Sequence, residues 1–131
     1  MNNICPLESA EQQLVVSWAN YAKFENYRVG DFLFAIPNGG SRRKAFGKVS
    51  LEAIRMKKEG IRAGVPDLML AIASENFHGL FIEMKRKIKS KSRVSDFQKE
   101  WHSKLKFQGY MVVVAYGADE AIMAIKKYLG I

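Results

Sequence analysis

Two short apolar runs in the middle of the chain each predict a β-strand. They cover residues 67–73 and 79–85, and the polar segment between them is typical of a hairpin. Each run carries an acid where a core strand normally has none: Asp67 opens the first and Glu83 interrupts the second. If the turn is centred near Glu75, the two carboxylates lie directly opposite each other, whereas a later turn offsets them by a few residues.

Helical periodicity predicts four helices, and strand patterns predict two strands besides the hairpin. In the first helix the expected buried stripe is Leu14, Trp18 and Tyr21. In the second helix Leu51 and Ile54 are expected to face the core. The helices are expected over residues 8–24, 51–59, 94–108 and 120–129, and the two further strands over residues 31–36 and 110–116.

The third helix and the last strand complete an α/β pattern. Phe97, Trp101 and Leu105 form the expected buried stripe of this helix. Residues 110–116 show no polar alternation, which indicates a strand that is covered on both faces. The chain has 131 residues and is 48% apolar, so it is long enough to bury a core. We therefore expect a single domain over residues 1–131.

The charge of the chain indicates a polyanionic partner. The formal net charge is +8 and the sequence pI is about 9.7, which favours nucleic acid. A solvated surface is the plainer interpretation of any one basic cluster. A membrane surface is less favoured, because the clusters do not lie opposite an apolar helix face. The candidate DNA-binding residues are Asn38, Arg42, Arg43, Lys44, Arg62, Arg86, Lys87, Lys89 and Lys91.

The cysteine and histidine content excludes several classes of protein. The single Cys5 rules out an internal disulfide framework and fits a reducing compartment. Two scattered histidines and one cysteine leave no zinc-ligand pattern. The first residues do not resemble a signal peptide, and no apolar run reaches the length of a membrane span. We expect an intracellular protein with no membrane partner and no small-molecule cofactor.

The acids of the predicted hairpin suggest phosphodiester chemistry. Burying unpaired carboxylates is costly, so Asp67 and Glu83 on neighbouring strands need a shared cation or strong donors. Lys85, two positions after Glu83, lies on the same face because strand side chains alternate. Carboxylates are hard ligands that suit Mg²⁺ or Mn²⁺. The charged ammonium of Lys85 is better suited to steady transition-state charge than to act as a base.

These residues resemble a known family. Pro66-Asp67, followed one strand later by Glu83-Met84-Lys85, is similar to the PD-(D/E)xK pattern of restriction-endonuclease-like nucleases. With the turn at residues 37–40, the run 58–68, and Gln98 followed by Trp101, Leu105 and Gly109-Tyr110, the chain resembles the VRR-NUC family from Glu8 to Leu129.

The resemblance implies an α/β fold with a restriction-endonuclease-like αβββαβ core, in which helices flank a mixed central sheet. It implies a divalent-metal site for Mg²⁺ or Mn²⁺, with Lys85 beside the attacking water. The implied metal ligands are Asp67, Glu83, Glu11 and the backbone carbonyl of Met84, and the implied catalytic residues are Asp67, Glu83, Lys85, Glu11 and Gln98.

The identity of the first-helix acid and the substrate stay open at this point. Glu8 competes with Glu11, and acids suit a helix N-terminus in any case. Stand-alone members of the family, from phages and bacteria, act as homodimers on branched DNA such as Holliday junctions, which implies a cytoplasmic location in a bacterial or phage-infected cell. The alternatives are a nuclease of the same fold with RNA or nicking specificity, and a non-catalytic nucleic-acid-binding protein whose acids pair with Lys85 and Arg62.

Overall fold

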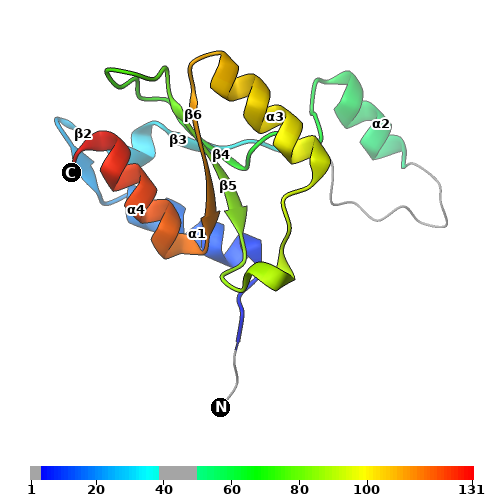
Figure 1. Cartoon of the computed structure of the whole chain (residues 1–131), viewed down its shortest axis with the longest axis horizontal. Coiled ribbons are helices and arrows are strands. Elements are labelled where there is room, and N and C mark those ends of the chain that lie inside the picture. The colour runs from blue at the N-terminus through cyan, green and yellow to red at the C-terminus, as the bar shows by residue number, and fades with distance from the viewer. Residues whose placement is uncertain (1–3, 39–49) are drawn as a thin grey trace.

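The computed structural model describes residues 4–38 and 50–131, which are built around a mixed sheet (Figure 1). Its first two strands, β3 (Leu33–Ala35) and β4 (Leu68–Leu70), are antiparallel. The third strand, β5 (Leu80–Lys85), is antiparallel to β4 and parallel to β6 (Met111–Tyr116). The order across the sheet is β3-β4-β5-β6.

Helices cover both faces of this sheet (Figure 1). The helices α1 (Glu8–Ala19) and α4 (Ala118–Leu129) pack against each other on one face. The helix α3 (Asp96–Phe107) makes the crossover between the parallel strands β5 and β6 and covers the other face. The helix α2 (Leu51–Lys58) lies outside these layers, near the start of α3.

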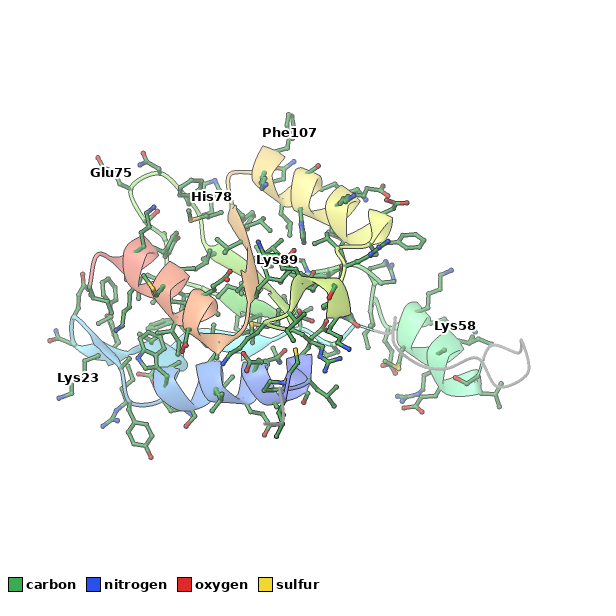
Figure 2. All side chains as sticks on the ribbon, turned by 60° about the horizontal axis from the view of Figure 1, so that its bottom comes forward. Lys23, Lys58, Glu75, His78, Lys89 and Phe107 are labelled. Carbon is green, nitrogen blue, oxygen red and sulfur yellow. The ribbon has the colours of Figure 1, made fainter. Side chains whose placement is uncertain are left out.

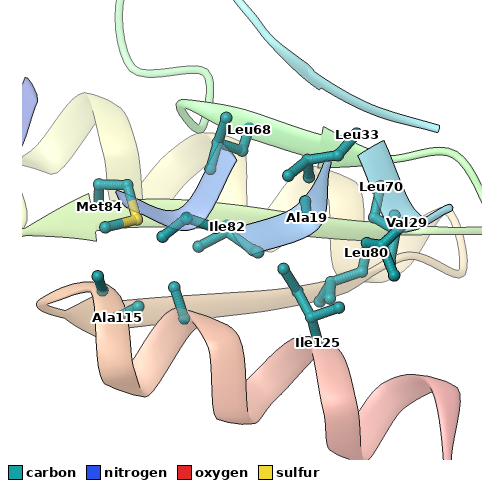
Figure 3. Close-up of a cluster of buried hydrophobic side chains, with 13 residues drawn as sticks. Ala19, Val29, Leu33, Leu68, Leu70, Leu80, Ile82, Met84, Ala115 and Ile125 are labelled. Atoms are coloured by element: carbon teal, nitrogen blue, oxygen red, sulfur yellow. The ribbon is translucent and has the colours of Figure 1, made fainter. Parts of the chain in front are cut away.

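The apolar core lies between the sheet and the pair α1 and α4 (Figure 3). Strand β5 contributes alternate residues to it, because successive strand side chains point to opposite faces. Leu80, Ile82 and Met84 are fully buried there, together with Ile125 of α4. The residues between them, including Glu83, point to the α3 side of the sheet.

The predicted fold and element order are confirmed. In the described residues the main elements follow as α1, β3, α2, β4, β5, α3, β6 and α4, which contains the αβββαβ core. Leu68 pairs with Ile82 and Leu70 with Leu80, so the hairpin is centred on residue 75. Continuing this register by one residue sets Asp67 directly opposite Glu83, and both side chains face α3.

The first helix ends earlier than the sequence predicts. It stops at Ala19, and the chain then forms a small hairpin of β1 (Lys23–Phe24) and β2 (Tyr27–Arg28), followed by a 3₁₀ turn at Val29–Asp31. The hairpin turns at Glu25, whose φ of 53° is left-handed. Strands of two residues are too short to show an alternating pattern, so the hydrophobic periodicity did not reveal them.

The buried face of α1 also differs from the prediction. Leu14 and Tyr21 are exposed to 56% and 76%, and of the predicted stripe only Trp18 packs against the core. Close packing of α1 against α4 and the sheet favours smaller side chains. The buried residues of the helix are Glu11, Val15 and Ala19.

Helices α2 and α3 expose side chains that were expected to be buried. Ser50 caps α2, since its Oγ accepts a hydrogen bond of 3.0 Å from the Ala53 N–H. However, no residue of α2 is buried, and Leu51 is 85% exposed. On α3, Phe97 is 66% exposed, whereas the polar residue His102 is buried.

No helix in residues 4–38 and 50–131 is both long enough and apolar enough to cross a membrane.

Candidate active site

The chain reaches the first acid through a tight approach to α3. Gly64 has a φ of +92°, and a side chain on it would meet the Phe97 carbonyl group at 2.7 Å. Three residues later, Asp67 leads into β4 and is held from two sides. Its Oδ2 accepts a hydrogen bond of 2.7 Å from the Met84 N–H, and its Oδ1 accepts one of 3.5 Å from Asn38 Nδ2. Its carboxylate is therefore fixed against the end of β5.

The second acid, Glu83, is 1% exposed, and two side chains of α3 hold its carboxylate. Gln98 Nε2 donates to Glu83 Oε2 at 3.1 Å. His102 Nε2 lies 3.4 Å from Glu83 Oε1. Gln98 and His102 are four residues apart, so they share one face of α3, one turn from each other. That face presents both side chains to the acid.

Gln98 also links this acid to the lysine of the motif. Its Oε1 accepts hydrogen bonds from Lys85 Nζ at 3.0 Å and from the Ser95 N–H at 2.9 Å. The Ser95 hydroxyl in turn accepts from the Gln98 N–H, which completes a capping box at the start of α3. Lys85 is 4% exposed and donates a second hydrogen bond, of 2.8 Å, to the Arg93 carbonyl. The helix cap thus orients the ammonium group beside the acids.

The carboxyl group of Glu83 is strongly affected by its surroundings. Burial, the hydrogen bond with Asp67 and the charge of Asp67 raise the pKa of Glu83 to about 9. The positive charge of Lys85 opposes this shift, and the charge of Glu8 adds to it. At neutral pH, Glu83 therefore retains its proton. Two acids that repel each other in this way have the electrostatics of a site that a cation would stabilise.

The two acids of α1 have different surroundings. Glu8 accepts a short hydrogen bond from the Ser92 hydroxyl, and its charge acts on Glu83. Glu11 is fully buried, and its Oε2 accepts a hydrogen bond of 2.6 Å from the Ala118 N–H at the start of α4. Its Oε1 has no hydrogen-bond partner among the described residues. Glu11 thus caps α4, whereas Glu8 belongs to the electrostatic surroundings of the acid pair.

The predicted DNA-binding residues have varied surroundings. Arg62 donates to the Lys57 carbonyl at 2.9 Å, and Arg86 donates to the carbonyls of Cys5 and Pro6 at 2.6 and 3.1 Å. Asn38 donates a hydrogen bond to Asp67. Three of the predicted lysines are on the exposed segment after β5: Lys87, Lys89 and Lys91. Lys89 Nζ lies 4.9 Å from the centre of the Tyr116 ring. The other three predicted residues, Arg42, Arg43 and Lys44, lie outside the described residues.

His102 was not predicted from the sequence as a residue of the site. Burial, together with the charges of Lys106 and Lys85, lowers the pKa of this histidine, so its ring is neutral at neutral pH. A neutral ring protonated on Nε2 can donate to Glu83 Oε1. Its spacing of four residues from Gln98 is a signal that could have found it. The predicted buried stripe of Trp101 and Leu105 lies on the neighbouring face of α3.

The side chains around Asp67 and Glu83 can be set against what a divalent cation requires. In residues 4–38 and 50–131, no three or more side chains of His, Cys, Asp or Glu gather as a metal-binding group. Mg²⁺, however, is commonly held by one or two carboxylates and keeps several waters. The half-buried Asp67 and the buried Glu83, with the displaceable proton of Glu83, fit such an ion.

The arrangement of helices around the mixed sheet is that of a restriction-endonuclease-like core. A solved structure, described as a VRR_NUC domain protein, is similar to the chain with a TM-score of 0.78 and 30% identity; the match covers 97% of this chain and 91% of that one. The sequence model of the VRR-NUC domain family matches residues 8–119 of the chain. The chain therefore belongs to the VRR-NUC domain family and has a nuclease-type function. None of the curated proteins compared with the chain matches it.

Proposed function

We propose that this chain is a divalent-metal-dependent DNA endonuclease that cuts branched DNA, such as Holliday junctions, as a homodimer. The observation that carries the proposal is the convergence of Asp67, Glu83 and Lys85 on the α3 side of the sheet. There, the buried carboxyl group of Glu83 retains a proton beside Asp67, and the buried ammonium group of Lys85 lies on the same strand as Glu83. Membership of the VRR-NUC family supports the same chemistry.

Each residue of the site has a proposed role. Asp67, Glu83 and the Met84 carbonyl would hold Mg²⁺ or Mn²⁺. When bound, the cation supplies Lewis-acid stabilisation of the charge on the phosphate. Lys85, oriented by the Arg93 carbonyl and Gln98, contributes a fixed positive charge beside the attacking water. Gln98 is a positioning residue, because it joins Glu83 to Lys85.

The first-helix acid is proposed to be Glu8. Its support is the effect of its charge on Glu83. Glu11, the residue favoured from the sequence, has one oxygen engaged by the start of α4. A Glu8→Gln variant should therefore lower cleavage more than Glu11→Gln does at temperatures where both are folded. Equal losses of activity in the two folded variants would contradict this assignment.

Substrate choice is proposed to follow DNA shape. Lysine contacts to phosphates carry no sequence information, so exposed basic segments would hold DNA through its backbone. The exposed lysines that directly follow β5 in the described part of the chain are Lys87, Lys89 and Lys91. Two copies of the chain would present two sites, which suits the cutting of two strands at a junction.

The deciding experiment compares cleavage of four-way-junction, flap and linear duplex DNA with Mg²⁺, with Mn²⁺ and with chelator. Cleavage of branched DNA that needs the metal is expected. Cutting that persists in chelator would reject the metal role, and preferential cutting of RNA would establish the RNase alternative. Tight DNA binding without metal uptake or cleavage would establish the non-catalytic alternative. The ion pairs required for that alternative, from Lys85 or Arg62 to Asp67 or Glu83, do not occur among the described residues.

A further inference from the structure

A pocket lies on the side of α3 that faces α2. Its volume is about 570 Å³, which falls within the range of small-ligand sites of roughly 300–1,000 Å³. Met56 and Ile61 line it on the α2 side, and the rings of Phe97 and Trp101 line it on the α3 side. These two rings are four residues apart and so lie on one face of the helix. Phe97 is 66% exposed although it is a large apolar side chain.

Cations surround these apolar walls. Lys57, Arg62 and Lys104 also line the pocket, and Glu100 is the acid among the described residues that line it. Lys104 Nζ lies 4.9 Å from the centre of the Trp101 ring and 3.5 Å from Glu100 Oε1. A site with aromatic faces inside and positive charge around them suits a ligand that has a flat, unsaturated ring and a phosphate.

The pocket is close to the acid pair. Phe97 precedes Gln98 and Trp101 precedes His102, so one side of α3 contacts Glu83 while the adjoining side lines the pocket. Only the body of this helix, about 10 Å wide, separates the two. A DNA strand that rises about 3.4 Å per nucleotide crosses that width in about three nucleotides.

We propose that this pocket binds an unpaired nucleobase of the DNA substrate, within about three nucleotides of the cut. The proposal rests on the proposed function, and it identifies the preferred substrate as DNA with an unstacked base beside the branch. A base can stack on a side-chain ring only when it has left the stack of the duplex. The phosphate of the same nucleotide would meet the cations around the pocket.

A second copy of the chain is a less suitable occupant of this pocket. Each copy carries a formal net charge of +8, so docking another copy here would bring positive charge to a site that is already surrounded by cations. A nucleotide supplies the opposite charge. The homodimer contact is therefore expected elsewhere on the molecule.

The test uses Phe97→Leu, which removes the ring but keeps an apolar side chain. Its matched control is Phe107→Leu on the same helix. Phe107 is 87% exposed, and Figure 2 shows it pointing away from the body at the end of α3 remote from Lys58 of α2. Ten residues of helix, about 15 Å, separate the two rings. Both residues are exposed, so thermal melting should show that both variants are folded.

Binding is measured with two DNAs in chelator, so that the DNA stays intact. One carries 2-aminopurine at an unpaired position beside a branch, and the other carries it in a fully paired duplex. Wild-type protein should quench the unpaired probe by stacking. Phe97→Leu should lose this quenching and weaken binding of the unpaired DNA by about tenfold, while binding of the duplex stays unchanged. Phe107→Leu should behave as wild type.

The results separate this proposal from the proposed function. Equal losses on both DNAs, or no difference between Phe97→Leu and Phe107→Leu, would overturn the base pocket even where the wild type cuts branched DNA. A change from dimer to monomer in sedimentation of Phe97→Leu, with quenching intact, would show that a second copy occupies the pocket. Wild-type protein that binds neither DNA would overturn the proposed DNA substrate as well.

Discussion

The two faces of β5 are equally buried but chemically opposite. All six residues of the strand are buried. Towards α1 and α4 the strand presents Leu80, Ile82 and Met84, whereas towards α3 it presents Phe81, Glu83 and Lys85. Burial of the first set stabilises the fold, because it removes apolar surface from water. Burial of the acid and the lysine costs free energy that their hydrogen bonds only partly offset.

This difference shows how one strand separates folding from chemistry. The apolar face holds β5 rigidly in the sheet, and the same strand then carries two ionisable groups at fixed positions on its other face. The side chains of α3 that meet those groups are polar: Gln98 and His102. Substitutions on the two faces should therefore affect different properties of the protein.

The largest effect is expected for Asp67→Asn on the α3 side. Loss of this carboxylate should lower the cleavage rate by about 10³-fold, in line with other losses of a group that stabilises transition-state charge. Folding and DNA binding should be retained. The measurement is the single-turnover cleavage of branched DNA with Mg²⁺. Asp119→Asn, which changes an exposed acid on α4, is the matched control and should cut as wild type does.

Ile82→Ala tests the opposite face. Ile82 is fully buried, so the change should lower the free energy of unfolding by about 2–5 kcal/mol. Urea unfolding followed by circular dichroism measures this loss. At a temperature where the variant is folded, its cleavage rate should stay close to that of wild type. A variant that is stable but inactive would mean that the two faces are not independent.

A smaller effect is expected at His102, which touches Glu83 from α3. His102→Ala should weaken Mn²⁺ binding by about tenfold, the lower end of the loss expected when a hydrogen-bond partner of a metal-binding carboxylate is removed. His102→Gln can still donate a hydrogen bond to Glu83 and should recover most of that affinity. Calorimetric titration of Mn²⁺ into each folded variant gives the comparison. Equal affinities for the alanine and glutamine variants would assign His102 a packing role only.

The smallest effect concerns pH and stability without metal. The folded protein keeps a proton on Glu83 up to a pKa of about 9, whereas the unfolded chain loses it near the ordinary value of 4.5. Since the folded state binds more protons over this range, its stability should fall as the pH rises. Glu83→Gln should reduce this dependence.

At about pH 9, this variant should melt about 5 °C higher than wild type. An increase of ~1 kcal/mol in the free energy of unfolding raises the melting temperature of a domain of this size by that amount. Thermal melts in chelator between about pH 7 and pH 9 test this, because His102, with its lowered pKa, stays neutral there. An unchanged slope would mean that Glu83 is ionised in the folded protein.

The order of the main elements could be predicted from the sequence, together with two candidate registers for the hairpin that carries the two acids. Alternating apolar runs give strands, and a hairpin centred on residue 75 brings Asp67 opposite Glu83 by simple counting. The start of α2 after Ser50 is also local information, because a cap is a local interaction, whereas α3 begins at Asp96 after its cap Ser95 and not at residue 94.

The buried faces of the helices could not be predicted in the same way. Periodicity favoured Leu14 and Tyr21 on α1 and Phe97 on α3, and all three are exposed. Which side of a helix is buried depends on the elements that pack against it. On α1, the arrival of α4 buries the polar residue Glu11, which no scale of hydrophobicity would choose.

The main helices and strands, their order and the position of Asp67 and Glu83 on neighbouring strands follow from the sequence alone, because local propensity and the two-residue period of strands set them. The structure then selected one hairpin register, the one that sets the two acids opposite each other. Only the tertiary structure decided that Gln98 and His102 share the carboxylate of Glu83, that Glu11 caps α4, and that Phe97 lines a pocket beside α2. The reason is physical: burial, hydrogen bonding and pKa depend on atoms brought together from distant parts of the chain.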